Sequence, residues 1–232
     1  MLEDVLQVRT PFVCFHVVRD SSGLYLIDGG FLGGVAALRH ALRRRGWDSL
    51  PIKGILLTHA HIDHTFNVAR LVREHSAWVA APRLDAEHCA GQYSYRGIAR
   101  ICGWLEAGAR AIWGYEAFKV DQWLDDGTEL PILDGLRAVH LPGHTIGHTG
   151  FYSPKLRLLF TGDLLRSDAF GAFLPPPIFN SCPSLLLGSI ARIGTFPVNG
   201  ILPNHGDSAI PAIHLARVRR RWPSTRSRTG SV

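Results

Sequence analysis

The sequence has no uninterrupted apolar run approaching the roughly 18 residues that a membrane-spanning helix requires. Its first residues, Met1-Leu2-Glu3-Asp4, also lack the basic start and apolar stretch of a secretory signal. We therefore expect a soluble, cytoplasmic protein with no membrane partner. Hydrophobic residues make up 46% and charged residues 19% of the 232 residues, which is typical of a compact globular chain and not of a disordered one.

The sequence also lacks a C-x-x-C pair, which argues against a zinc knuckle and against a thioredoxin-like redox motif. Because the first residues do not resemble an export signal, we expect the four cysteines to be reduced and mostly to fill packing positions. They are Cys14, Cys89, Cys102 and Cys182.

Acidic residues are absent from the last 16 residues, 217–232, which contain six arginines. The formal net charge of +6 comes from this segment, because the 25 basic residues less these six leave 19, which balance the 19 acidic residues. A groove for a polyanion needs positive charge along its length. We therefore expect residues 217–232 to be a flexible basic tail and nucleic acid not to be a partner.

Short β-branched or aromatic runs alternate with helical patterns, which predicts an α/β fold. Residues 1–216 are expected to form a single domain, with an inserted helical and aromatic segment at about 84–123. The expected helices cover Gly34–Arg45, Phe66–His75 and Ser184–Ile193. The expected strands cover Phe12–Val18, Leu24–Ile27, Ile52–Leu57, Trp78–Ala81, Leu136–Leu141, Gly150–Tyr152, Leu156–Phe160 and Gly200–Leu202.

The segment 84–123 is rich in tyrosine and tryptophan, including Tyr93, Tyr95 and Tyr115. One interpretation is a helical hairpin whose aromatic side chains pack on the core. Another is a lid or pocket wall in which these tyrosines contact a substrate, because long insertions often control access to a site. The sequence is compatible with both.

The strongest functional signal is the run Thr58-His59-Ala60-His61-Ile62-Asp63-His64, which follows an expected strand and precedes a helical pattern. Three imidazoles and a carboxylate within six residues are more than packing requires, and both groups are zinc ligands. His59 and His61 can point to one side of an extended turn, while Asp63 and His64 can point to a neighbouring position. This division suits two metal ions better than one.

Three further ligand-type residues each follow an expected strand: His144, Asp163 and His205. Side chains at neighbouring strand ends converge on one edge of a sheet, where open α/β folds commonly place their sites. Each residue alone is a weak signal, but together with the run from His59 to His64 they predict a metal centre.

The pattern H-x-H-x-D-H followed by His, Asp and His resembles the metallo-β-lactamase superfamily. This resemblance implies a four-layer αβ/βα sandwich. It also implies that Asp163 bridges two ions, and that Asp28, in an Asp-x-Gly turn, supports the site without binding metal. His148, Thr58 and Thr145 are expected to orient ligands by hydrogen bonding. The implied ligands are His59, His61 and His144 for the first metal, and Asp63, His64 and His205 for the second.

The implied cofactors are two divalent metal ions, with Zn²⁺ expected first and Fe or Mn as alternatives. Two such ions can hold a hydroxide between them and make it nucleophilic near neutral pH. Asp63 is the expected catalytic residue, because it could orient this hydroxide or pass on its proton. We therefore expect a hydrolase acting on a small-molecule substrate.

Comparison with other members of the superfamily narrows the types of bond that this chain is expected to hydrolyse. True β-lactamases lack a carboxylate where Asp163 stands, which makes antibiotic hydrolysis a poor fit. Glyoxalase II-like thioesterases carry a helical glutathione-binding domain that is not expected here. Related lactonases have a tyrosine where this chain has Arg166, which could instead meet an anionic substrate or form a surface ion pair. The expected substrate is therefore a small ester, thioester or lactone.

Two alternatives stay open. A persulfide dioxygenase of the same superfamily would use one iron, held by two histidines and one aspartate. A phosphodiesterase or nuclease would use two metals for displacement at phosphorus, although the neutral body argues against it. The sequence does not indicate an oligomeric state.

Overall fold

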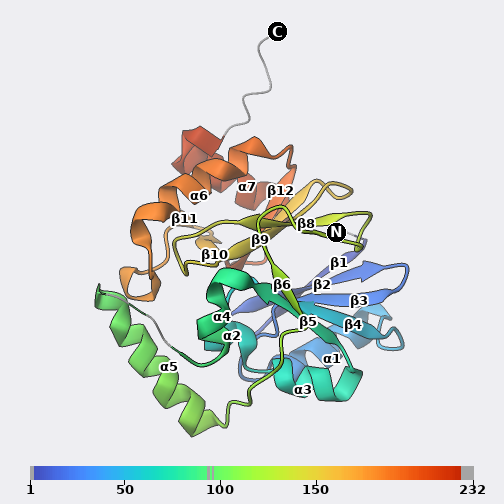
Figure 1. Cartoon of the computed structure of the whole chain (residues 1–232). Coiled ribbons are helices and arrows are strands. Elements are labelled where there is room, and N and C mark those ends of the chain that lie inside the picture. The colour runs from blue at the N-terminus through green and yellow to red at the C-terminus, as the bar shows by residue number, and fades with distance from the viewer. Residues whose placement is uncertain (1–2, 93–94, 96, 226–232) are drawn as a thin grey trace. The chain divides into compact units, whose positions relative to one another are not determined.

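The computed structural model describes residues 3–92, 95 and 97–225, and the chain divides into two compact units. The first unit comprises residues 1–94 and 100–124, and the second comprises residues 95–99 and 125–232. Each unit contains one sheet of six strands together with helices, which Figure 1 shows coloured along the chain.

The sheet of the first unit keeps its strands in chain order. The first three strands pair antiparallel, whereas the third to the sixth run parallel. The carboxyl ends of the parallel strands therefore lie at the same edge, where the polar segments after them can meet. The strands are β1 (Val5–Arg9), β2 (Cys14–Asp20), β3 (Gly23–Ile27), β4 (Ile52–Leu56), β5 (Trp78–Pro82) and β6 (Gln122–Leu124).

Amphipathic helices cover this sheet. Helix α1 spans Gly34–Arg45, as its periodicity predicts, and it buries Leu38 and Leu42 in the same core as Leu71 of the third helix. The segment predicted at Phe66–His75 is divided between two helices. The remaining helices of this unit are α2 (Ile62–Thr65), α3 (Val68–His75), α4 (Ala86–Cys89) and α5 (Arg100–Trp113), with a 3₁₀ turn at Arg83–Asp85.

The second unit contains a mostly antiparallel sheet in the order β11-β10-β9-β8-β7, with β12 parallel to β10. Its core includes Leu159, Leu186 and Val218. The strands are β7 (Glu129–Leu130), β8 (Leu136–His140), β9 (Thr149–Ser153), β10 (Leu158–Asp168), β11 (Gly171–Phe173) and β12 (Gly200–Gly206). The helices are α6 (Leu186–Arg192) and α7 (Pro211–Arg221), and 3₁₀ turns cover Gly97–Ala99, Pro177–Phe179, Pro183–Leu185, Ile193–Thr195 and Pro223–Thr225.

Two strands of the second unit are longer than their apolar runs predict. Asp163 lies inside β10 and His205 inside β12, whereas both were expected just past a strand. β10 and β12 stay paired in parallel as far as Ser167 and Gly206, although the register is irregular between Phe160 and Arg166. An irregularity of this kind re-aims side chains, and it places Asp163 at the break in the ladder.

The boundary expected at residue 217 falls within α7, which continues to Arg221. Val218 is fully buried, and Arg217 donates a hydrogen bond of 2.9 Å to Asp207. The helix exists because its buried positions repeat at helical spacing despite the many arginines. Residues 226–232, with the last two of the six arginines, lie outside the described residues.

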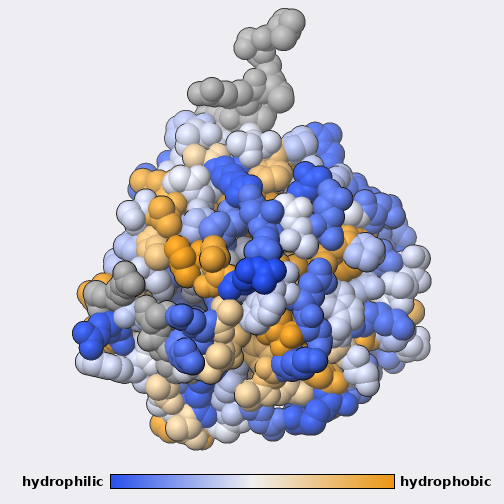
Figure 2. All heavy atoms as spheres, viewed as in Figure 1, coloured by the Kyte–Doolittle hydropathy of each residue, from blue (hydrophilic) through white to orange (hydrophobic). Residues whose placement is uncertain are grey.

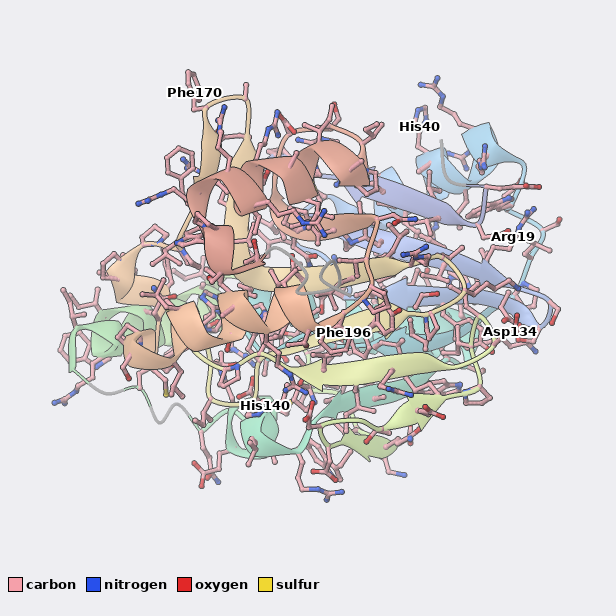
Figure 3. All side chains as sticks on the ribbon, turned by 90° about the horizontal axis from the view of Figure 1, so that it is seen from above. Arg19, His40, Asp134, His140, Phe170 and Phe196 are labelled. Carbon is pink, nitrogen blue, oxygen red and sulfur yellow. The ribbon has the colours of Figure 1, made fainter. Side chains whose placement is uncertain are left out.

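The exterior is mixed in character. On the face drawn in Figure 2, hydrophobic patches alternate with hydrophilic side chains. Figure 3 labels several side chains, including His40 on α1 and Asp134. Within the part of the chain that the structure describes, no helix combines the length and the hydropathy of a membrane span.

Candidate metal centre

The loop after β4 holds four of the seven expected ligands in a small volume. The ring centroid of His59 lies 4.7 Å from that of His61 and 4.1 Å from that of His64. Asp63 and His64 belong to the short helix α2, which turns Asp63 Oδ2 to 3.5 Å from His64 Nε2. All three imidazoles are buried, whereas Asp63 is partly exposed. The extended turn followed by one helical turn therefore gathers all four donor groups.

Asp28 orients this loop from the neighbouring strand. β3 and β4 are parallel and Ile27 pairs with Leu56, so the segments after both strands lie side by side. The buried carboxylate of Asp28 accepts hydrogen bonds of 2.8 Å from both the backbone N–H and the hydroxyl of Thr58, and one of 2.9 Å from His64 Nδ1. Asp28 therefore ties the loop after β4 to the end of β3, and its role as a support that binds no metal stays a prediction.

These contacts also determine which nitrogen carries a hydrogen in the rings of His59 and His64. Because the Thr58 hydroxyl donates to Asp28, its oxygen accepts from His59 Nδ1, at 2.9 Å. The hydrogen of His59 and of His64 is thus on Nδ1, which directs Nε2 as the coordinating nitrogen. This is the arrangement that metal-binding histidines commonly adopt.

The second unit contains the other three ligand-type residues, grouped around Asp163. Asp163 Oδ2 lies 2.9 Å from His205 Nε2 and 3.5 Å from His144 Nε2. Asp163 and His205 are neighbours because β10 and β12 are parallel, while His144 follows β8. Oδ2 of Asp163 therefore lies near the Nε2 atoms of both imidazoles, which are the nitrogens that would bind metal.

Two side chains hold this trio in place. The amide of Asn180 donates to the carbonyls of Pro175 and Pro176, so its oxygen accepts from His144 Nδ1, at 3.1 Å. His148 donates from Nδ1 to the carbonyl of Leu141 and accepts the N–H of Asp163 at Nε2. His148 therefore links the backbone at Leu141 and Asp163, and its role in orienting ligands stays a prediction. Asn180 contacts His144 from a segment that the sequence did not single out.

Glycine is required beside His144. Gly143 has a φ of 143°, a conformation that side chains rarely adopt, and a Cβ there would lie 2.6 Å from Leu186 Cδ2. The backbone of the His144 loop can therefore approach α6 only without a side chain at this position.

A buried glutamate that was also not expected contacts the loop after β4. Glu106 of α5 accepts the N–H of Ile62 at 2.7 Å and pairs with His88 Nε2 at 2.9 Å. Burial raises the pKa of Glu106, but the nearby His61 and His88 and the N–H of Ile62 outweigh this effect and lower it to about 2. The only sequence signal is a charge in the middle of the buried stripe of α5.

The four candidate substrate contacts differ in their surroundings. Arg166 is exposed and pairs with Asp168 at 3.1 Å, so it forms the surface ion pair that was one of its two interpretations. Tyr115 packs under Arg110, whose guanidinium lies 3.8 Å from its ring centroid, and burial raises the pKa of Tyr115. Tyr95 is buried, and Tyr93 lies outside the described residues.

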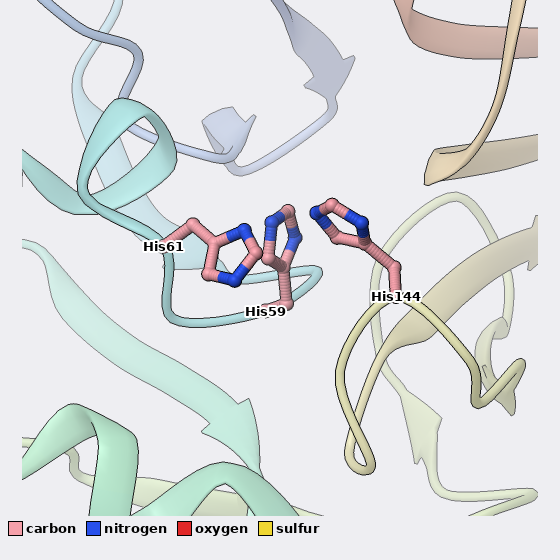
Figure 4. Close-up of side chains that lie close together, drawn as sticks. All are labelled: His59, His61 and His144. Carbon is pink, nitrogen blue, oxygen red and sulfur yellow. The ribbon is translucent and has the colours of Figure 1, made fainter. Parts of the chain in front are cut away.

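The donor groups suit a divalent transition metal. Imidazole nitrogens and carboxylate oxygens are ligands of zinc and of iron, and the hydrogen bonds at Nδ1 hold the rings in the tautomer that coordination requires. Figure 4 shows His59 and His61 on the loop after β4 and His144 on the loop after β8.

A family model described as the metallo-beta-lactamase superfamily matches residues 13–205. The chain belongs to this superfamily. Its matched region contains all seven ligand-type residues, and the αβ/βα sandwich expected from the sequence is confirmed as its fold.

Curated relatives of this superfamily member include two named as hydroxyacylglutathione hydrolases. One, from Bartonella henselae, is 28% identical over 166 residues, which cover 72% of this chain and 52% of the relative. The other, hydroxyacylglutathione hydrolase GloC from Haemophilus influenzae, is 29% identical over 165 residues and 68% of each chain. The chain thus spans about half the length of the first relative and about two thirds of the second.

Solved structures agree on the fold. TTHA1623, solved in a di-iron-bound form, is 29% identical, with a TM-score of 0.66 over 91% of this chain and 96% of that one. BJP-1, a subclass B3 metallo-beta-lactamase of Bradyrhizobium japonicum, is 22% identical, with a TM-score of 0.66 over 94% of this chain and 87% of that one.

Proposed function

We propose that this chain is a hydrolase that uses two divalent metal ions. His59, His61 and His144 hold the first ion, and Asp63, His64 and His205 hold the second. The observation that carries the proposal is the position of Asp163. A single oxygen of this carboxylate faces the Nε2 atoms of His144 and His205, one from each ligand set. A carboxylate placed in this way can bridge two ions.

Three further findings support two ions. Seven ligand-type residues form two clusters, four in the loop after β4 and three around Asp163, which is more than one zinc ion binds. The family match, over residues 13–205, spans every one of them. One related structure, that of TTHA1623, was solved in a di-iron-bound form. We propose zinc first, because the first set is all imidazole, with iron or manganese as the alternatives.

The residues around the proposed metal ligands orient these ligands in the absence of substrate. Two divalent ions bound here would lower the pKa of water and polarise a substrate carbonyl. Asp28 and Asn180 keep His59, His64 and His144 in the coordinating tautomer, so no reorientation is needed. We propose that Asp63, which is partly exposed beside His64, accepts a proton from water.

We propose a thioester as the bond that is cut. Both curated relatives described above are named for the hydrolysis of a hydroxyacylglutathione, which is a small thioester. The proposed metal ligands suit the hydrolysis of esters and lactones equally well. The thioester is proposed first because both relatives are named for it. We expect the substrate to be a small molecule.

Metal analysis combined with a substrate panel tests the proposal. Protein purified without added metal should contain about two zinc or iron ions per chain. It should release thiol from a hydroxyacylglutathione faster than it opens a lactone or cleaves bis-p-nitrophenyl phosphate. One iron per chain with oxygen uptake would instead indicate a dioxygenase, and active protein without metal would refute the proposal.

The bridging residue gives a sharper prediction. Asp163→Ala should lower the metal content and reduce thioester hydrolysis on the order of 100-fold or more, because even residues that only support a ligand cost 10–100-fold. Asp48→Ala is the matched control, since Asp48 is exposed and its backbone is not in the left-handed region. Full metal content and full activity in Asp163→Ala would show that this carboxylate does not bridge.

A further inference from the structure

Helix α5, shown in light green in Figure 1, forms two hydrogen bonds with the backbone of the loop after β4. Glu106 accepts the N–H of Ile62 at 2.7 Å, and Arg110 donates to the carbonyl of Ala60 at 3.3 Å. Ala60 and Ile62 are the two residues that flank His61. The helix therefore holds the backbone on both sides of a proposed metal ligand.

Apolar packing reinforces these two hydrogen bonds. Ile62 lies in a small cluster with Val13 and Phe31, against which Ala109 and Tyr115 pack. The rings of Phe31 and Trp113 are 5.2 Å apart and meet edge to face. Helix α5 therefore contacts the loop through Glu106, Ala109 and Arg110, while Trp113 packs on Phe31 beside it.

Glu106 is placed where helical periodicity predicts an apolar residue. It is 5% exposed and shares the buried side of α5 with Cys102 and Gly103. A buried carboxylate is costly unless it is paired and hydrogen-bonded. Here both oxygens have partners, because one accepts from Ile62 and the other pairs with His88.

The carboxylate also faces His61 itself. Glu106, Cys102 and His61 each have a donor atom within 4.8 Å of the others, and the ring centroids of His61 and His88 are 5.3 Å apart. A negative charge beside a metal-binding imidazole increases its basicity and restricts its orientation. A carboxylate that only stabilised the fold would not need to lie beside a ligand.

We propose that Glu106 is a positioning residue for the first metal site, where it holds His61 and its flanking backbone in the geometry that binds the ion. This inference rests on the proposed function. It assigns a role to the segment 84–123: the α5 part of it braces the metal-binding loop.

Metal affinity of folded variants tests this role. Co²⁺ and Zn²⁺ binding would be measured by competition with a chromophoric chelator, and the Co²⁺ absorption spectrum would report the geometry of the site. Glu106→Gln keeps the size of the side chain and an acceptor for the N–H of Ile62 but removes the charge, whereas Glu106→Ala removes both. Glu87→Gln is the matched control, because Glu87 is exposed and adjacent to His88.

We expect Glu106→Gln to weaken Co²⁺ binding and Glu106→Ala to weaken it further, by about 10–100-fold, with a changed Co²⁺ spectrum. Glu87→Gln should bind like the unmodified protein. Folded Glu106→Gln that binds Co²⁺ within twofold of the unmodified protein, with the same spectrum, would overturn the inference alone. Unmodified protein that binds neither metal would overturn the proposed centre, and the inference with it.

Discussion

At the residue scale, the carboxylate of Asp28 accepts hydrogen bonds from Thr58 and His64 in the loop after β4. Asp28 has a φ of 68°, which asparagine tolerates, so Asp28→Asn tests the carboxylate without straining the backbone. The three groups around it all donate to it, and an amide nitrogen in place of either oxygen would set donor against donor. We expect a loss of about 1–3 kcal/mol in the free energy of unfolding of the metal-free protein.

The same substitution should weaken metal binding by about 10–100-fold, because His59 and His64 lose the contacts that fix their tautomers. Urea denaturation and chelator competition measure the two effects separately. Asp48→Asn, at an exposed position, should change neither quantity. If Asp28→Asn had the metal affinity of the unmodified protein, the hydrogen bonds at Nδ1 would not control coordination.

The ligand-type residues could be predicted from the sequence because each sits at or near the end of an apolar run, and strand ends converge. The residues that orient them could not all be found in this way. Asp28 was found through its turn, whereas Asn180 and Glu106 approach His144 and His61 from segments more than 30 residues away. Only Glu106 left a signal, as a charge within an apolar stripe.

At the scale of elements, an ion-pair group joins α1 to α3. Glu74 pairs with Arg70 at 2.8 Å within α3 and with Arg39 of α1 at 2.9 Å. The hydrogen bond from Arg70, opposed by burial and aided by Arg39, holds the pKa of Glu74 below its usual value. The folded state therefore binds this proton more weakly than the unfolded state does, and the stability that Glu74 adds is present above its usual pKa of 4.5.

This contribution should disappear as the pH falls from 4.5 through the lowered pKa of the folded state. Glu74→Gln should cost at most about 1 kcal/mol near pH 7, since such pairs are partly exposed, and should cost less at acidic pH. Urea denaturation at several pH values measures this difference, with Glu87→Gln as the control. A cost that is equal at pH 7 and at pH 3.5 would show that the charge of Glu74 is not responsible.

Elements were predictable where the local pattern agreed with the final packing. Helix α1 has apolar residues at helical spacing and glycine on both sides, and its predicted bounds are those of the structure. Strand β10 continues beyond its apolar run because β12 pairs with it, which only the folded chain determines. Helix α7 was missed because its arginines concealed the buried His214, Leu215 and Val218.

At the scale of the whole molecule, the fold class followed from alternating strands and helices and from the ligand pattern. The division into two compact units did not, because each unit recruits distant segments: residues 100–124 belong to the first and residues 95–99 to the second. The proposed ligands are divided in the same way. His59, His61, Asp63 and His64 lie in the first unit, and His144, Asp163 and His205 lie in the second.

If one centre uses ligands of both units, metal must stabilise both units together. A ligand that binds only the folded state adds about 2.7 kcal/mol at 100 times its Kd, which for a chain of this size raises the Tm by about 5–10 °C. Hydrogen exchange should show which segments the metal stabilises. When Zn²⁺ is added, peptides covering the His59–His64 loop and peptides covering β10 and β12 should gain protection together. Protection confined to one unit would mean that the ligands of the other unit do not share the ion, because a shared ion cannot stabilise one side of its own coordination sphere alone.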